Sequence, residues 1–122
     1  MPLQNMSIKR FLNSFKYAFY GIRQVLKEEQ TFQIHVCAMV IVLFFSIYVF
    51  HFSYIELALT LLCIALVIVS EIINTSIEHT WDHLEPNHHP VVKSVKDMMA
   101  GATAIASIFS AILWAILIWH HL

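Results

Sequence analysis

The sequence predicts an all-α integral membrane protein, with an amphipathic N-terminal helix at the membrane interface and three transmembrane helices. Of the 122 residues, 59% are hydrophobic, which lies above the roughly 45–50% usual for soluble domains. Three long apolar runs are separated by short polar breaks, and a basic segment precedes the first run. The length allows one small membrane domain, residues 1–122.

The N-terminal segment, about residues 5–28, combines a regular apolar face with most of the basic charge. Its apolar side chains recur at spacings of three and four, at Ile8, Phe11, Leu12, Phe15, Phe19, Ile22 and Leu26. The basic residues fall mostly on the other side, as in a helix that lies in the membrane interface. Because a charged segment follows Met1, we expect no removable signal peptide. The helix is either an anchor alone or also contributes Tyr17, Tyr20 or Arg23 to a site.

Two apolar runs follow the basic segment. The first, residues 32–50, has 19 residues, and at about 1.5 Å per residue it spans roughly one hydrocarbon thickness. The second runs from about 55 to 73, and its helix is expected to continue to about 82. Residues 51–54 leave room only for a tight turn. His35 lies about one turn inside the first span, where a histidine either bonds to a neighbouring helix or serves a functional site.

The last third of the chain is predicted to contain a polar loop and a third span. Pro86, Asn87 and Pro90 interrupt the apolar pattern, which indicates a loop at 83–93. Ser94 and Asp97 have the spacing of a helix N-terminal cap. The third span covers about 98–119, and its first half is rich in Ala, Gly, Ser and Thr, which permit close helix contacts.

The distribution of Lys and Arg predicts the orientation in the membrane. Five of the seven basic residues precede the first span, two lie between the second and third spans, and none lies in the turn at 51–54. The positive-inside rule then places the N-terminus and the 83–96 loop in the cytoplasm and the C-terminus outside. With a net charge of -1 and no basic stretch interleaved with aromatics, we expect no nucleic-acid partner.

The most informative stretch is VIVSEIINTSIEHTWD, residues 67–82, where an apolar run acquires Glu71, Asn74, Glu78 and Asp82. On a helix that turns about 100° per residue, these four positions fall within roughly 80° of one another. An ionisable residue in hydrocarbon costs on the order of 2.5–3.5 kcal/mol, so it normally faces a protein interior or an aqueous cavity. This polar stripe of three carboxylates and one amide indicates a cation site.

The spacing of these groups suggests separate tasks. Glu71 and Glu78 are about 10.5 Å apart along a helix, too far to hold one ion together. Mg²⁺ prefers one or two carboxylates with substrate phosphates, which suits Glu78 together with Glu29. Glu71 lies deeper, and burial suits a carboxylate to accept a proton from a hydroxyl. Lys96, at the expected helix start, could clamp a phosphate. These parts describe phosphoryl transfer; the alternative is a structural network of salt bridges.

The stripe EIINTSIEHTWD, followed by KSVKDMMAGA, resembles the signature of the small prokaryotic diacylglycerol kinase family. In that signature a Glu-x-x-Asn-[Ser/Thr]-x-Ile-Glu-x-x-x-Asp stretch precedes a Lys-Asp pair that opens the last helix. The resemblance covers almost the whole chain. It implies a homotrimer of three-span subunits in a bacterial plasma membrane, with composite active sites between subunits. It also implies that ATP and Mg²⁺ are used to phosphorylate a lipid alcohol.

The same resemblance assigns roles to individual residues. Position by position, the resemblance implies that Glu71 is the general base and that Glu29 and Glu78 bind the metal. It implies that Asn74 is a polar partner in the site and that Lys96 and Asp97 contact phosphate. Arg10 and Tyr17 match the residues on the nucleotide side.

Two departures from the Gram-negative pattern bear on the acceptor. His35 stands where Gram-negative diacylglycerol kinases carry Glu, and Met99-Ala100 replaces a Gly-Ser pair. Both changes resemble the Gram-positive branch, whose members act on undecaprenol. The sequence therefore favours undecaprenol kinase, with diacylglycerol kinase as the alternative.

Two other classes of protein are alternatives to a kinase. A non-enzymatic membrane assembly protein would use the stripe only to pair helices. A cation channel or transporter would need carboxylates at depth in the first and third spans, which the sequence lacks. His79 and His83 have the spacing of a transition-metal pair, but they point away from the stripe, so we expect an interfacial role for them.

Overall fold

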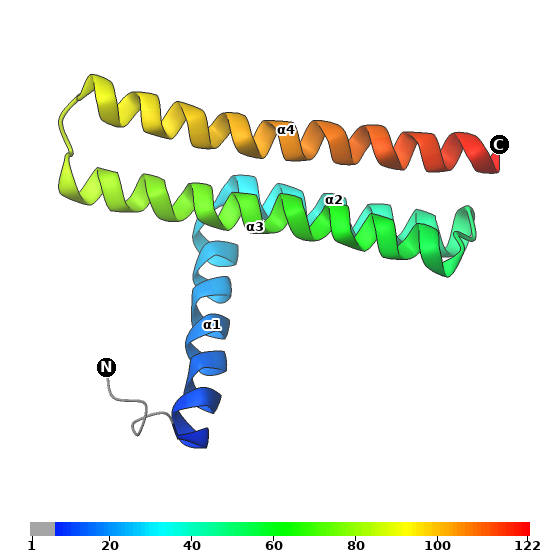
Figure 1. Cartoon of the computed structure of the whole chain (residues 1–122), viewed down its shortest axis with the longest axis horizontal. Coiled ribbons are helices and arrows are strands. Elements are labelled where there is room, and N and C mark those ends of the chain that lie inside the picture. Colours follow the sequence, from blue (N-terminus) through cyan, green and yellow to red (C-terminus); the bar gives the residue numbers. More distant parts are fainter. Residues whose placement is uncertain (1–6) are drawn as a thin grey trace.

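The computed structural model describes residues 7–122, and nearly all of them are helical. The elements are α1 (Ile8–Glu28), α2 (Gln30–Phe44), a π-helical segment η2 (Phe45–Val49), α3 (Tyr54–Leu84) and α4 (Pro90–His121) (Figure 1). Residues 5 and 6 of the expected N-terminal helix lie outside the described part. Ser7 caps α1, because its side chain accepts a hydrogen bond from the backbone N–H of Arg10.

Three helices are long and apolar enough to cross a membrane, namely Gln30–Val49, Tyr54–Leu84 and Pro90–His121. The second and third contain 31 and 32 residues, so at 1.5 Å per residue each is about 45–50 Å long, more than a hydrocarbon core of about 30 Å. Their joined ends are polar and can extend beyond the bilayer. The chain is therefore an all-α membrane protein.

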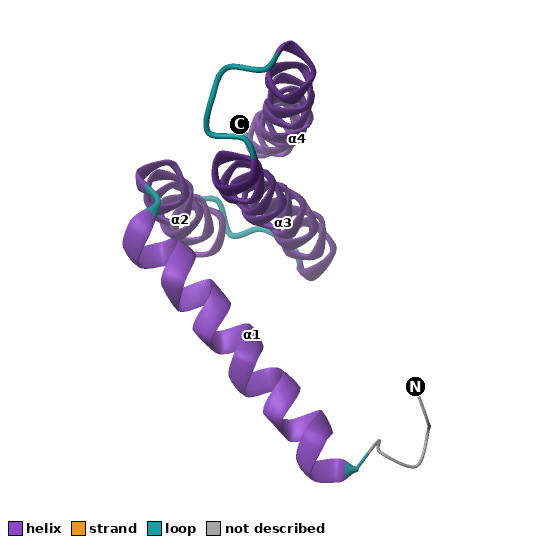
Figure 2. Ribbon diagram, turned by 90° about the vertical axis from the view of Figure 1, so that its left-hand side faces the viewer, coloured by secondary structure: helices purple, strands orange, loops and turns teal. Residues whose placement is uncertain are grey.

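The helix α3 forms the middle of the arrangement. It packs along α4 on one side and more sparsely against α2 on another, whereas α1 leads away from the other three helices (Figures 1 and 2). Hydroxyl groups join α4 to the backbone of α3: Thr103 Oγ1 donates to the carbonyl of Ser70 at 3.4 Å, and Ser110 Oγ donates to that of Cys63 at 3.4 Å. Thr103 belongs to the small-residue stretch that was expected to permit close helix contact, and Ser110 lies just beyond it.

The turn between α2 and α3 is closed by backbone and side-chain bonds. Ser53 and Glu56 form a reciprocal capping box at the start of α3. The N–H of Phe52 donates to the carbonyl of Ser46 at 2.8 Å, and His51 takes a positive φ of 52° that lets the chain reverse. The turn expected at 51–54 is therefore observed at residues 50–53, between η2 and α3.

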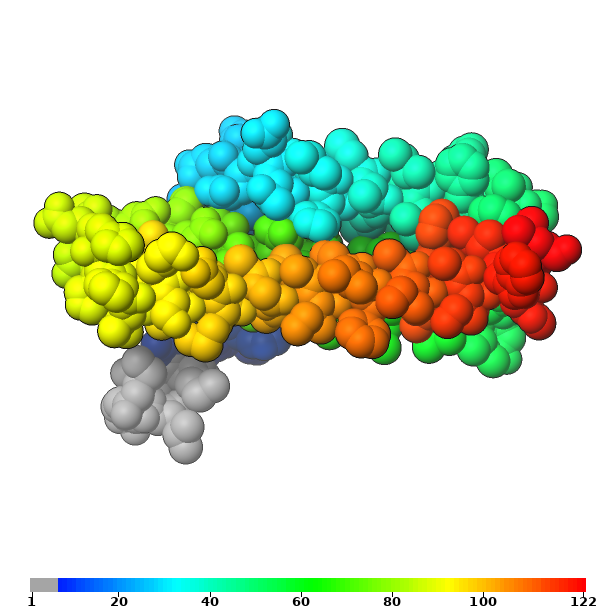
Figure 3. Space-filling view, turned by 90° about the horizontal axis from the view of Figure 1, so that it is seen from above, coloured from blue at the N-terminus to red at the C-terminus, as the bar shows by residue number. Residues whose placement is uncertain are grey.

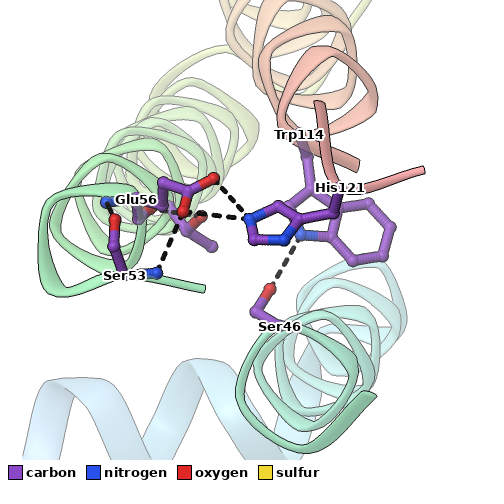
Figure 4. A network of polar contacts seen from close by, with 6 residues as sticks. Ser46, Ser53, Glu56, Trp114 and His121 are labelled. Carbon is purple, nitrogen blue, oxygen red and sulfur yellow. Dashed lines mark hydrogen bonds and ion pairs between the residues drawn. The ribbon is translucent and has the colours of Figure 1, made fainter. Parts of the chain in front are cut away.

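The C-terminal end of α4 is tied to this turn (Figure 4). Trp114 Nε1 donates to Ser46 Oγ at 2.8 Å, and His121 Nε2 lies 2.8 Å from an oxygen of Glu56. The His121 ring also stacks on Phe52, with centroids 5.1 Å apart. These contacts hold all three spans together at the end of the molecule opposite the polar stripe.

The start of α4 differs from the sequence-based expectation. Ser94 was expected to cap the helix, but the helix begins at Pro90 with His89 as its N-cap, so that expectation is wrong. Proline suits the first helical position because its φ is already helical and it has no N–H to leave unpaired. Imidazole Nδ1 of His89 accepts a bond from the N–H of Val91 at 3.2 Å. Only 85–89 lie outside helices between α3 and α4.

Little apolar surface is buried within a single chain. Among residues 7–122, the buried hydrophobic side chains are Phe32, Phe52 and Val92, and most large apolar side chains point outward. In a bilayer, lipid covers such side chains without cost, and helix association relies on packing and polar contacts instead. The outward faces are thus available to lipid or to other subunits.

Candidate active site

The polar stripe of α3 faces inward at its deepest residue. Glu71 is only 4% exposed although it carries a carboxylate. Thr75, one turn further along, is also buried. Beside Thr75, Asn74 Nδ2 donates to Glu78 Oε1 at 3.5 Å, whereas Asp82, near the end of α3, is exposed. The stripe therefore runs from a buried carboxylate to an exposed one.

The buried Glu71 has a partner on α2. Nε2 of His35 lies 3.1 Å from Glu71 Oε1. His35 is the sixth residue of α2, and the rotation of α2 against α3 brings it opposite the carboxylate. The His35 side chain is more exposed than that of Glu71, 25% against 6%. This contact gives the buried carboxylate a polar partner, which an ionisable group in such a place requires.

An open cavity of about 470 Å³ lies over this pair. Its polar lining comes from three helices, with Thr31 and His35 on α2, Glu71 and Asn74 on α3, and Thr103 and Ser107 on α4. Ala100 and Ala104 complete the α4 wall with small side chains. Seen from above, α2 and α4 lie beside each other with α3 beneath them (Figure 3). The cavity can thus admit the reacting end of a substrate to Glu71.

A second, apolar cavity of about 210 Å³ adjoins the first. His35 and Ser107 line both cavities. From them the apolar cavity follows the same three helices toward Trp114, with Met39, Val42 and Ile64 among its lining residues. A polar cavity that continues as an apolar one suits an amphipathic ligand with a polar end and a hydrocarbon tail.

The two carboxylates expected to bind metal lie near the same end of α3. Glu29 occupies the junction of α1 and α2, where an extended backbone separates the helices. Its Oε1 lies 2.8 Å from Nε2 of His79, the neighbour of Glu78 in the chain. The contact fixes Glu29 against α3. It also gives His79 a carboxylate partner, which sequence spacing alone did not indicate.

The residues present suit Mg²⁺ better than a metal held by protein alone. Asn74 Oδ1 is buried and has no hydrogen-bond partner in the described chain, next to the carboxylate of Glu78. Within residues 7–122, no group of three or more His, Cys, Asp or Glu residues could enclose a metal ion. Mg²⁺ typically takes one or two carboxylates and completes its shell with water and substrate phosphates. Oxygen ligands from Glu78, and from Glu29 nearby, fit that pattern.

Lys93 and Lys96, in the first turns of α4, pair with carboxylates near the joined ends of α3 and α4. Lys96 Nζ bonds to Asp82 Oδ1 across α3 and α4, and Lys93 Nζ bonds to Asp97 Oδ2 at 2.6 Å within α4. Lys96 is the seventh residue of α4, so the free N–H groups of the helix start do not assist it as the sequence suggested. The ammonium group alone is what Lys96 offers to an anion.

The nucleotide-side residues predicted on α1 do not join this cluster. Arg10 and Tyr17 belong to the first half of α1, which points away from α2, α3 and α4 (Figures 1 and 2). Tyr17 is 67% exposed. Within one chain, the structure brings together Glu71, Asn74 and Glu78 on α3 and holds Glu29 against the same helix through His79, whereas the first half of α1 carries Arg10 and Tyr17 away from this cluster.

The chain has three helices long enough to cross a membrane, and a cavity between them is lined by the ionisable residues His35 and Glu71. These features define a small integral membrane protein with a site near one end of its spans. Residues 16–118 match the prokaryotic diacylglycerol kinase family, so the chain belongs to this family of lipid kinases. That membership supports an enzyme over the non-enzymatic assembly protein.

Named relatives within this family show both acceptor types. The chain is 37% identical to the undecaprenol kinase of Bacillus subtilis over 87% of its own length and 85% of the relative's. It is 32% identical to a diacylglycerol kinase of Helicobacter pylori, covering 93% of the chain and 88% of the relative. It is 28% identical to the diacylglycerol kinase of Escherichia coli, covering 92% and 91%.

Proposed function

We propose that this protein transfers the γ-phosphoryl group of ATP, with Mg²⁺, to the hydroxyl of a membrane lipid alcohol, with undecaprenol as the preferred acceptor. The observation that carries the proposal is the buried carboxylate of Glu71 in a polar cavity that adjoins an apolar one. A lipid alcohol has the matching shape, because its hydroxyl would lie in the polar cavity and its hydrocarbon in the apolar one.

In this proposal Glu71 is the general base. Its carboxylate takes the proton of the lipid hydroxyl, the hydroxyl oxygen attacks the γ-phosphorus, and the bond to ADP breaks. The burial of Glu71 suits this task because bulk water competes less with the lipid hydroxyl for the carboxylate. Asn74, which lines the same cavity, is proposed to hydrogen-bond the reacting groups.

The phosphates are proposed to lie farther toward the polar end of α3. Glu78 and Glu29 would hold Mg²⁺, which supplies charge neutralisation to the triphosphate when bound. Lys96 is proposed to leave Asp82 for a phosphate oxygen, and Asp97 to hold the neighbouring part of the nucleotide site. The contacts of both residues at the exposed helix ends cost little to exchange, since exposed ion pairs are worth about 0–1 kcal/mol.

The active unit is proposed to be a homotrimer. Arg10 and Tyr17 are expected to bind the nucleotide, yet α1 carries them away from Glu71 of the same chain. A neighbouring subunit can receive this helix, and the outward apolar faces offer surface for the contact. We further propose that α1 lies in the cytoplasmic interface, with the 85–89 loop on the same side and the C-terminus outside.

Two observations favour undecaprenol over diacylglycerol. The similarity to the Bacillus subtilis undecaprenol kinase is 37%, against 32% and 28% for the two diacylglycerol kinases. The chain also carries His35 beside the proposed base, the position at which the sequence resembles the undecaprenol branch. Diacylglycerol stays the second candidate acceptor, because both alcohols join one hydroxyl to a hydrocarbon body.

The test is phosphate transfer from ATP by the purified chain in mixed micelles that contain undecaprenol and diacylglycerol together. We expect Mg²⁺-dependent transfer, mainly to undecaprenol, and less than about 1% of it with Glu71→Gln, since a positioned general base contributes roughly 10²–10⁴-fold. Preference for diacylglycerol would overturn the acceptor and keep the mechanism. Full activity of folded Glu71→Gln would overturn the role of Glu71.

A further inference from the structure

The contact between His35 and Glu71 supports a role for the histidine that the family signature does not include. Within residues 7–122, these two are the ionisable residues that line the 470 Å³ cavity. No Lys or Arg of the described chain lines it, so His35 is the cavity residue able to give Glu71 a charge-assisted hydrogen bond.

The geometry defines what the imidazole does for the carboxylate. Nε2 of His35 lies 3.1 Å from Oε1 of Glu71, within ion-pair distance, and an Nε2 that carries a proton can donate to an ionised carboxylate, which only accepts hydrogen bonds. The contact involves one oxygen of Glu71 and leaves the other with capacity for a further donor. A hydroxyl that approaches from the cavity is such a donor.

The position of His35 places its contact with Glu71 at the point where the acceptor would react. His35 lines both the polar and the apolar cavity, whereas Glu71 lines only the polar one. The hydroxyl of an alcohol whose tail follows the apolar cavity would therefore arrive beside the pair.

We infer that His35 is a positioning residue, which holds the Glu71 carboxylate in the orientation that accepts the acceptor's proton. The inference rests on the proposed function. In the step it assists, the hydroxyl proton passes to the free oxygen of Glu71, the hydroxyl oxygen forms its bond to the γ-phosphorus, and the bonding electron pair of the broken P–O bond leaves with ADP.

The expected loss of kcat follows from the orientation of the Glu71 carboxylate that His35 is inferred to maintain. Without the imidazole, nothing in the described part of the chain holds Oε1, and the carboxylate can rotate within an open cavity. A displacement of about 1 Å at a reacting group can cost about 100-fold in rate. The nucleotide contacts proposed for Lys96 lie on another helix end, so the loss should fall on kcat and not on the KM for ATP.

The experiment compares His35→Ala, His35→Gln, Glu71→Gln and, as the matched control, His88→Ala in the exposed 85–89 loop. Each is the full chain in mixed micelles with undecaprenol, with kcat and the KM for ATP measured separately. We expect His35→Ala to lower kcat about 100-fold with the KM for ATP within about twofold of the parent chain. His35→Gln should recover at least about tenfold of that loss, because its amide N–H can donate the same bond. His88→Ala should match the parent.

The outcomes separate this inference from the proposed function. Unchanged kcat in His35→Ala, with Glu71→Gln inactive, would overturn the inference and leave the proposed function standing. The hydrogen-bond role is wrong if His35→Gln is as slow as His35→Ala. It is also wrong if His35→Ala does not fold and the folded His35→Gln turns over about 100-fold more slowly than the parent. Absence of transfer by the parent chain, or full activity of Glu71→Gln, would overturn the proposed function itself.

Discussion

Replacing Trp114 by phenylalanine should weaken the connection between α4 and the π-helical segment η2. The Trp114 indole donates to Ser46 Oγ at 2.8 Å, and Ser46 is completely buried. Phenylalanine keeps an aromatic ring beside Phe50, whose centroid lies 6.5 Å from that of Trp114, but it cannot donate. Interhelical hydrogen bonds in membrane proteins are worth about 0.6 kcal/mol on average and up to about 1.7 kcal/mol. Because this bond is short and its acceptor Ser46 is buried, we expect a value in the upper half of that range.

A double-mutant cycle of Trp114→Phe with Ser46→Ala isolates the bond from the change in ring size. The free energy of unfolding would be measured in mixed micelles by titration with dodecyl sulfate, followed by far-UV circular dichroism. Trp119→Phe serves as the control, since Trp119 is 80% exposed and should have little effect. A coupling free energy below about 0.3 kcal/mol, within the error for independent sites, would refute the reasoning.

Three further predictions concern the charged residues. Glu29→Gln should raise the Mg²⁺ concentration needed for half-maximal transfer by at least about tenfold, since even outer-shell losses at metal sites cost about 10–100-fold, while the exposed neighbour change Glu28→Gln should leave it unaltered; equal effects would show that the wrong glutamate was assigned. Lys96→Met should lower kcat by roughly 10²–10³-fold, the cost of one charge-stabilising donor, and Lys93→Met by less than about twofold because its exposed pair is weak; steady-state kinetics with ATP decide this. His121→Ala should lower the free energy of unfolding by about 0.5–1.5 kcal/mol with kcat unchanged, and a loss of activity without loss of stability would contradict its purely structural role.

The features predicted correctly from the sequence depend on one helix at a time. Apolar run length predicted three spans, and helical periodicity placed Glu71, Asn74 and Glu78 on one face of α3, where Glu71 is buried and Asn74 bonds to Glu78. The start of α4 was misplaced because two N-cap signals compete. Pro90 at the first helical position outweighs the Ser94 pattern, and a helix that has already begun has no free N–H groups left for Ser94 to cap.

Contacts between helices could not be predicted from the sequence, because they depend on how each helix is rotated against its neighbour. His35 and Glu71 are 36 positions apart in different spans, and nothing local selects one as the partner of the other. The pairs His79 with Glu29 and Lys96 with Asp82 share this property. The sequence did show that His35 and Glu71 are both ionisable residues inside apolar runs. Each such residue needs a polar partner.

The charges near the cavity bear on how a nucleotide would be bound under the proposed function. Glu71, Glu78 and Glu29 are all acidic, so a triphosphate would be repelled by this end of α3 unless cations intervene. On α3 and α4, the Lys and Arg residues are Lys93 and Lys96 alone, and each bonds to a carboxylate. Five of the seven basic residues instead lie on α1, which extends away from its own cavity. A nucleotide at Glu78 would therefore depend on Mg²⁺ and on the α1 of a neighbouring subunit, so dilution to monomers should abolish ATP binding while leaving the His35–Glu71 contact intact.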